Sequence, residues 1–259
     1  EKFYSDSPSQ NYWANTFFPA VSEARTAKVF KPRAEALKAM LLHNGVKGGV
    51  RIVDVGAGDG TMLNEIKNVG LGKEFVAVEP TPDLAEVCKS RGFRVFNCFA
   101  EAASKEKALV DSAFLVTSFE VFEHLVSPFD FLNHLSSICR KDGVVFLTGL
   151  FGSGFDIQVL GRHSKALTPP HHLNFISRNG LAQLLQRCGL QEISFSTPGK
   201  LDVDIVRNAF RKDSSVITEP FLRNLFQEDD PDTLDAFQEF LTYHNMSSHM
   251  WVLARKIES

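Results

Sequence analysis

Short apolar runs alternate with amphipathic stretches along most of the chain. The apolar runs are rich in β-branched residues, and in the stretch 61–69 Met62, Ile66 and Val69 recur at helical spacing. This alternation is typical of βαβ units. It predicts strands over residues 50–55, 75–78, 93–96, 113–118, 143–147, 191–196 and 250–254. Between them it predicts helices over 61–69, 84–89, 129–139 and 177–187.

Seven strands with interleaved helices predict an α/β fold with a doubly wound, mostly parallel sheet. Ligands of such sheets bind at the carboxyl ends of the strands, near the switch point. Two segments fall outside the alternation. Residues 1–44 form an aromatic-rich leader that we expect to be helical, and Phe and Leu spacing predicts helices within 200–245. Each segment either forms a lid over the site or covers apolar sheet surface.

The composition is that of a folded globular protein, with 259 residues, 44% hydrophobic and 23% charged. A net charge of −3 and the lack of a basic block argue against a nucleic-acid partner held through phosphates. No apolar run reaches the ~20 residues of a membrane span, and the start does not resemble a signal peptide. Four scattered cysteines predict buried thiols rather than a disulfide framework. We therefore expect a cytoplasmic protein without a membrane partner.

The most informative motif is the glycine-rich segment VDVGAGDG, residues 53–60, between a predicted strand and a predicted helix. Glycines let the backbone turn tightly and approach a ligand, and the helix N-terminus supplies free N–H groups. The next strand ends at Glu79, about twenty residues after Gly60, where a carboxylate can accept hydrogen bonds from ribose hydroxyls. The sequence thus favours a nucleoside-containing cofactor, either NAD or S-adenosylmethionine.

The spacing G-x-G-x-G, preceded by Asp54, departs from the G-x-G-x-x-G of dinucleotide-binding enzymes. It resembles the first motif of the class I S-adenosylmethionine-dependent methyltransferases, and the resemblance runs from about Val50 to the end. Ala100–Glu101, the segment SFEVFEH at 118–124 and the closing MWVLARK at 250–256 resemble later motifs of that family. The whole chain resembles the small-molecule types 11, 12 and 23, and a Rossmann-like oxidoreductase is the alternative.

The resemblance implies a seven-stranded Rossmann-like fold in a single methyltransferase domain over 1–259. Its parts would be a helical leader (1–46), a cofactor-binding core (47–199), a helical insertion (200–246) before the last strand, and that strand (247–259). The implied cofactor is S-adenosylmethionine. The residues implied to bind it are Asp54, Gly56, Ala57, Gly58, Gly60, Glu79, Pro80, Ala100, Glu101, Phe119 and Glu120.

Two clusters could activate an acceptor. One comes just after a predicted strand and the other immediately before a predicted helix, so both are expected at the carboxyl edge of the sheet. One is Glu120-x-x-Glu123-His124, and the other is His171-His172 within PPHHLNFIS at 169–177. If the first turn is helical, Glu120 and Glu123 share a face. Resemblance to small-RNA 2′-O-methyltransferases and ubiquinone-pathway O-methyltransferases implies a Mg²⁺, Mn²⁺ or Zn²⁺ site. Its ligands would be Glu120, Glu123 and His124, with His172 or His171 as the fourth.

Resemblance of residues 171–177 to sugar C-methyltransferases implies instead that His172 is a metal-free general base. Other family members use neither a metal ion nor a histidine base. His124 and His171 therefore stay candidate catalytic residues beside His172. We expect methylation of a hydroxyl, with carbon as the second choice, on a small sugar-containing acceptor such as a nucleotide-linked sugar. Arg162 and Lys165 could meet an anionic acceptor. The alternatives are a metal-dependent 2′-O RNA methyltransferase and a catalytically silent cofactor-binding module.

Overall fold

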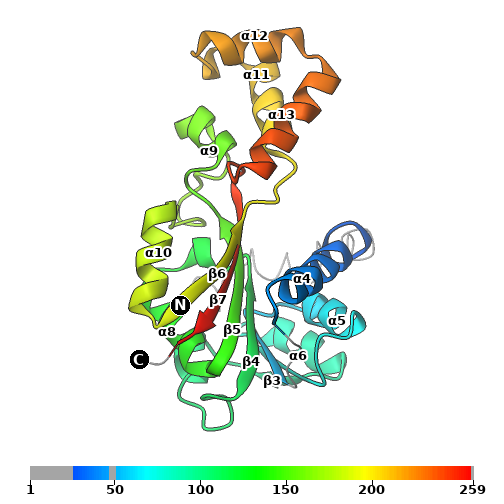
Figure 1. The fold of residues 1–259 in the computed structure, drawn as a ribbon, viewed down its shortest axis with the longest axis vertical. Helices are drawn as coiled ribbons and strands as arrows, with labels where there is room; N and C mark the ends of the chain where they lie inside the picture. The colour runs from blue at the N-terminus through cyan, green and yellow to red at the C-terminus, as the bar shows by residue number, and fades with distance from the viewer. Residues whose placement is uncertain (1–25, 47–50, 258–259) are drawn as a thin grey trace.

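A computed structural model describes residues 26–46 and 51–257 of the chain (Figure 1). The predicted mostly parallel sheet is confirmed: seven strands lie in the order β3-β2-β1-β4-β5-β7-β6, and β7 runs antiparallel to both of its neighbours. The strands are β1 (Arg51–Val55), β2 (Glu74–Val78), β3 (Arg94–Phe96), β4 (Ala113–Phe119), β5 (Cys139–Leu150), β6 (Leu190–Ser196) and β7 (His249–Lys256).

Helices cover both faces of the sheet, as the doubly wound prediction requires. On one face pack α4 (Lys31–His43), α5 (Thr61–Asn68) and α6 (Pro82–Ser90), and on the other α7 (Ala100–Ala103), α8 (Pro128–Ile138) and α10 (Arg178–Arg187). Each face has its own cluster of buried aliphatic side chains. No helix in the described part of the chain carries an apolar stretch long enough to cross a bilayer.

Strand β5 is the element whose length differs most from the expectation. It begins at Cys139 rather than at the predicted Gly143. The prediction missed this start because residues 140–142 (Arg-Lys-Asp) are exposed and carry no apolar signal. The later residues of β5 are buried and alternate between the two faces. Hydrophobic patterning detects only this buried part of the strand.

The chain leaves β1 towards β2 and β3 on one side, and returns to place β4 and β5 on the other. The carboxyl ends of β1 and β4 therefore form the switch point of the sheet, where α/β sheets bind ligands. The aromatic part of the predicted leader, residues 1–25, lies outside the described residues. After it, a π-helical turn η2 (Thr26–Phe30) leads into α4, which buries Ala34, Leu37 and Leu41.

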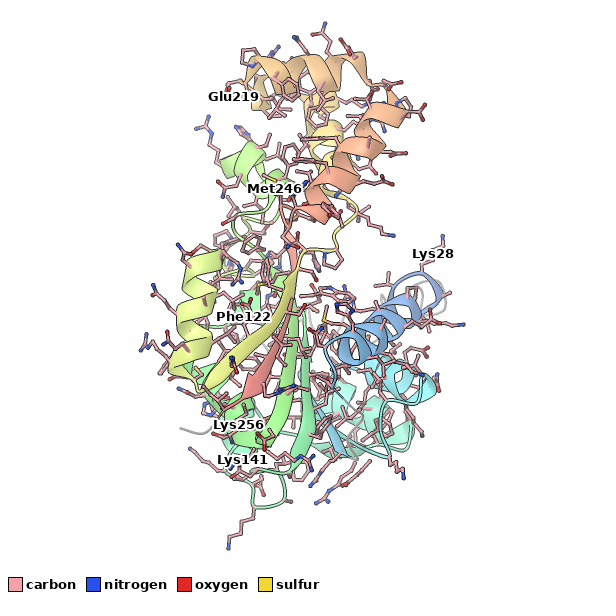
Figure 2. All side chains as sticks on the ribbon, in the orientation of Figure 1. Lys28, Phe122, Lys141, Glu219, Met246 and Lys256 are labelled. Carbon is pink, nitrogen blue, oxygen red and sulfur yellow. The ribbon has the colours of Figure 1, made fainter. Side chains whose placement is uncertain are left out.

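The predicted insertion is helical and forms α11 (Asp202–Lys212), η5 (Ser214–Val216), α12 (Pro220–Glu228) and α13 (Pro231–Tyr243). With α9 (Phe155–Leu160), which follows β5, these helices make a helical lobe beyond the end of the sheet (Figure 1). The lobe has its own core, made of Leu160, Val203, Val206, Ile217, Phe226, Leu234 and Leu241. Figure 2 shows Met246 near the sheet and Glu219 at the far end of the lobe.

The chain enters and leaves the α11–α13 segment at neighbouring points, because β6 and β7 are antiparallel partners. Hydrogen bonds close this junction. The backbone N–H of Ser247 donates to Thr197 Oγ1 (3.0 Å), and that of Ser248 donates to Asp202 Oδ1 (2.6 Å). The buried Asp202 thus fixes the first turn of α11 to the start of β7.

Candidate active site

The glycine loop lies between β1 and α5, at the switch point. Its start is held to β2, since the N–H groups of Gly56 and Ala57 donate to the Val78 carbonyl (2.8 and 3.2 Å). Gly58 has φ +58°, and a Cβ there would meet no atom within 4 Å. Gly60 has φ +79°, and a Cβ there would lie 2.7 Å from Cys88 Sγ. Gly60 is thus required by packing, whereas Gly58 leaves open space beside the backbone.

Asp54 is buried at the end of β1. Its Oδ1 accepts a 2.7 Å hydrogen bond from Thr117 Oγ1 of β4, while its Oδ2 is buried with no hydrogen-bond partner among the described residues. Burial raises the pKa of Asp54 to about 7; the Thr117 hydrogen bond lowers it, and the nearby charge of Glu79 adds to the rise. An unpaired buried oxygen at the switch point of a sheet is a candidate ligand-binding group.

Glu79 at the end of β2 holds the glycine loop. Its carboxylate accepts from the N–H groups of Gly58 and Thr81, both at 2.8 Å. Burial raises the pKa of Glu79, and these hydrogen bonds oppose the rise. The amide of Asn97 donates to the carbonyls of Glu79 and Pro80 (2.8 and 3.1 Å), which fixes the turn after β2.

The remaining residues expected around the cofactor lie at the same edge. Ala100 is buried at the start of α7 and Glu101 is exposed on it, while Phe119 at the end of β4 packs on Phe146 with ring centroids 5.7 Å apart. These features fit S-adenosylmethionine. They are the open space at Gly58, a buried carboxylate on each of two neighbouring strands, and an aromatic side chain at the end of the next strand. The glycine loop can approach the cofactor closely, and the carboxylates can accept from its hydroxyl and ammonium groups.

Glu120 joins three elements just after β4. Its Oε1 lies 3.0 Å from Arg33 Nη1 of α4 and accepts from Thr148 Oγ1 of β5 (2.7 Å). Its Oε2 lies 2.8 Å from His249 Nε2 at the start of β7. Glu120 has φ +55°, a left-handed backbone conformation that costs free energy for any residue other than glycine. These contacts hold the backbone there.

Glu123 has different surroundings from Glu120. The helical turn η3 (Phe122–His124) begins only after Glu120, so the two carboxylates do not share a helix face. Glu123 is 3% exposed, and its Oε2 has no hydrogen-bond partner. Burial, with a smaller contribution from the charge of Glu120, raises its pKa to about 8. Glu123 is therefore turned into the core beside β5.

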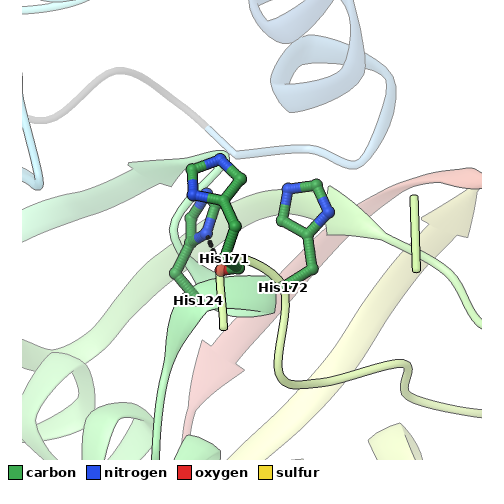
Figure 3. A group of neighbouring side chains, drawn as sticks. All are labelled: His124, His171 and His172. Carbon is green, nitrogen blue, oxygen red and sulfur yellow. Dashed lines mark hydrogen bonds between the residues drawn. The ribbon is translucent and has the colours of Figure 1, made fainter. Parts of the chain in front are cut away.

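His124, His171 and His172 come together from two segments (Figure 3). Each offers a ring nitrogen, and these nitrogens lie within 4.8 Å of one another, the spacing of a group that could hold a metal ion. We call these three residues the histidine cluster. Within the described part of the chain, the carboxylates of Glu120 and Glu123 do not belong to this group.

Backbone carbonyls fix the protonation of two of these rings. His124 Nδ1 lies 2.7 Å from the carbonyl of His171, and His172 Nδ1 lies 2.8 Å from that of Ala166. Because a carbonyl oxygen only accepts, each Nδ1 is the donor, and in the neutral tautomer that this selects the lone pair is on Nε2. Burial lowers the pKa of His124, as it does for His171, and the neighbouring imidazoles lower both further. The backbone hydrogen bond partly opposes this shift at His124.

The loop that carries His171 and His172 is tied to the turn after β4. The N–H groups of Leu173 and Asn174 both donate to the Glu123 carbonyl (2.7 and 3.0 Å), and the Asn174 side chain donates to the Leu125 carbonyl. The histidine cluster therefore has a fixed scaffold. Such an arrangement can accept a proton, bind a metal ion, or orient a polar ligand.

The family model described as "methyltransferase domain" matches residues 22–194 of the chain. This chain belongs to the methyltransferase domain family. It is a class I S-adenosylmethionine-dependent methyltransferase with a Rossmann-like fold, as the glycine loop implied. No curated protein sequence matches it.

Solved structures of other methyltransferases share the fold. An S-adenosylmethionine-dependent methyltransferase from Thermotoga maritima is 16% identical, with a TM-score of 0.59 over 94% of this chain and 96% of that one. One from Archaeoglobus fulgidus is 16% identical, with a TM-score of 0.56 over 93% and 100%. Geranyl diphosphate C-methyltransferase from Streptomyces coelicolor, solved with Mg²⁺, geranyl diphosphate and S-adenosyl-L-homocysteine, is 14% identical, with a TM-score of 0.54 over 86% and 77%.

Several residues of this methyltransferase's site do not stand out in its sequence. Thr117 could have been found from the sequence, because it is a polar residue inside a largely apolar strand. Arg33, Thr148 and His249, which contact Glu120, carry none. Their contacts join positions far apart in the chain, and only the packing of α4, β5 and β7 brings them together.

Proposed function

We propose that this methyltransferase transfers the methyl group of S-adenosylmethionine to a hydroxyl of a small, sugar-containing acceptor. The observation that carries the proposal is the histidine cluster beside the turn after β4. A hydroxyl becomes a good nucleophile only when its proton is removed or its pKa is lowered. An alkene carbon attacks the methyl group without prior deprotonation and gives up a proton only afterwards, from the carbocation. Three imidazoles that can act before the transfer therefore favour a hydroxyl.

The glycine loop, Asp54 and Glu79 would hold the cofactor, with Pro80, Ala100 and Glu101 next to the adenosine side and Phe119 and Glu120 next to the methionine side. Bound S-adenosylmethionine supplies a methyl group already activated on a sulfonium. The residues of the chain therefore have two tasks, alignment of the acceptor and removal of its proton. We assign the second task to the histidine cluster, in which the Nε2 lone pair of His172 is set by its Nδ1 hydrogen bond to Ala166.

An anionic group on the acceptor would suit this face of the molecule. Arg162 and Lys165 are exposed on the segment that leads to His171 and His172. The S. coelicolor relative binds a small molecule with a diphosphate, so the fold accommodates such ligands. A nucleotide-linked sugar offers both a diphosphate and vicinal hydroxyls. We place this reaction in the cytoplasm, a location that agrees with the four free cysteines.

The test is transfer of labelled methyl groups to pools of nucleotide sugars, free glycosides and RNA. We expect label in sugar-containing hydroxyls, and a loss of at least ~100-fold in His172→Gln, in line with the usual contribution of a proton-transfer group. The control His43→Gln changes an exposed histidine at the end of α4 and should keep full activity.

Binding of S-adenosylhomocysteine, measured by calorimetry, shows whether the variants are folded. Label in RNA alone would favour the 2′-O RNA methyltransferase instead. Cofactor binding without transfer to any pool would favour a catalytically silent module. Full activity in His172→Gln would remove this residue from the chemistry.

A further inference from the structure

The resemblance to metal-dependent relatives implied two glutamates and two histidines as ligands, but the geometry brings together a different set. Ring centroids of the three histidines lie 4.6 Å (His124–His171), 4.9 Å (His124–His172) and 4.7 Å (His171–His172) apart. Three neutral imidazoles suit Zn²⁺ and similar transition metals, whereas Mg²⁺ prefers oxygen ligands. The donor set is therefore that of a transition-metal site.

Two further features match how proteins prepare histidines for metals. A metal-ligating histidine donates its other ring N–H to a carbonyl or carboxylate, which fixes the ring and its tautomer. His124 and His172 both donate Nδ1–H to backbone carbonyls. The two segments are also tied together, because Leu173 and Asn174 donate to the Glu123 carbonyl.

We propose that His124, His171 and His172 bind a divalent transition-metal ion of the Zn²⁺ class, with a fourth coordination position left for water or an acceptor hydroxyl. Ligand nitrogens of a tetrahedral zinc site lie about 2.0–2.1 Å from the metal. The three nitrogens lie within 4.8 Å of one another, so the side chains must move closer together to reach this bond length. Glu123 takes no part, since its carboxylate packs beside Gly149 and away from the cluster.

Binding of the ion stands on the geometry alone, whereas its role in catalysis rests on the proposed function. A bound ion lowers the pKa of a coordinated hydroxyl. The hydroxyl proton passes to solvent, the oxygen forms a bond to the methyl carbon, and the sulfur–carbon bond breaks with its electron pair kept on sulfur. With an ion bound, His172 would serve as a ligand rather than as the proton acceptor, and the ion would take over the task that the metal-free cluster assigns to His172.

The binding test uses Co²⁺ as a spectroscopic probe and Zn²⁺ in equilibrium dialysis, on the full chain stripped with a chelator. We expect one ion per chain and the d–d absorption of a tetrahedral nitrogen site. His171→Ala and His172→Ala should weaken binding by more than ~100-fold, because loss of even an outer-shell partner costs roughly 10–100-fold. Glu120→Gln, Glu123→Gln and His43→Gln should bind as the parent does.

His171 is exposed, so its substitution is the variant least able to disturb folding, and S-adenosylhomocysteine binding reports on the fold of the histidine variants. Far-UV circular dichroism reports on the fold of the glutamate variants. No saturable binding would overturn the proposal, as would unchanged binding in His171→Ala and His172→Ala. Loss of binding in Glu120→Gln or Glu123→Gln would also overturn it and restore the carboxylate–histidine set.

Activity separates this inference from the proposed function. Methyl transfer that persists after chelation would refute a catalytic metal and leave the hydroxyl-methyltransferase proposal standing. One bound ion without transfer to any hydroxyl would refute the proposed function and leave the metal site standing. Transfer that is lost on chelation and restored by Zn²⁺ would support both.

Discussion

Asp54 shows how one residue of the site is held in an unfavourable state. It is fully buried beside Thr117, and its second oxygen has no hydrogen-bond partner. A buried carboxylate without full pairing is costly, and protonation relieves that cost. The raised pKa is the thermodynamic sign of the same penalty. The stability of the cofactor-free protein should therefore depend on pH through this group.

We expect Asp54→Asn to change the pH dependence of stability. The pKa of Asp54 rises from 3.8 to about 7 on folding. At pH values between these two pKa values, the native state therefore holds a proton that the unfolded chain lacks. Stability from this group therefore increases as the pH falls from about 7 to about 4, by about 1.4 kcal/mol per pH unit. Urea unfolding across this range should show that slope in the parent relative to Asp54→Asn.

The matched control is Asp83→Asn, which changes an exposed aspartate on α6. Its profile should follow that of the parent. If Asp54→Asn and the parent give parallel profiles over this range, Asp54 does not take up a proton on folding.

At the scale of elements, α4 is fixed to the site by one ion pair. The Arg33 side chain is 14% exposed and reaches across to Glu120, which also contacts β5 and β7. The apolar face of α4 packs against the core beside β1 and α5. The ion pair thus adds a polar connection between the leader helix and the carboxyl edge of β4.

We expect Arg33→Ala to loosen α4 without unfolding the sheet. Loss of a partly buried pair costs about 1–3 kcal/mol, between the values for exposed and fully buried pairs. Amide exchange in α4 should become faster, while exchange in β1 and β4 stays near that of the parent. Lys31→Ala changes an exposed residue of the same helix and serves as the control. Equal acceleration in both variants would show that the pair does not hold α4.

Elements and site residues differ in how far the sequence predicts them. Buried strands such as β1 and β4 are largely apolar, so patterning finds them. The histidines were expected at one edge because one segment follows a strand and the other precedes a helix, and they meet there. The directions of Glu120 and Glu123 could not be predicted, because the left-handed backbone at Glu120 depends on contacts with α4, β5 and β7. Local pattern carries no information on such long-range contacts.

At the scale of the whole molecule, the helical lobe is a second hydrophobic unit. Its core shares no residue with the two clusters that cover the sheet. Phe226 of α12 is 2% exposed at its centre, whereas Phe221 of the same helix is 72% exposed. Separate cores allow separate cooperative units, which open with different free energies.

We therefore expect Phe226→Ala to unfold the lobe selectively. Truncation of a buried phenylalanine costs about 3–5 kcal/mol. Amide protection in α11–α13 should fall sharply, while that in β4 and β5 stays high, as read by hydrogen exchange with mass spectrometry. Phe221→Ala should leave both regions unchanged. Uniform loss of protection across lobe and sheet would mean that the molecule unfolds as one unit.

The antiparallel pairing of β6 with β7 affects which parts of this chain can diverge during evolution. In the parallel part of the sheet each crossover must span a face, but the segment 197–248 only has to connect two neighbouring strand ends. Residues can be gained, lost or exchanged there without altering the register of the sheet or the glycine loop. Two constraints are the apolar surface that covers Leu160 of α9 and the hydrogen bonds by which Thr197 and Asp202 close the junction. The sequence and length of this segment can thus diverge while the glycine loop and the sheet are inherited unchanged.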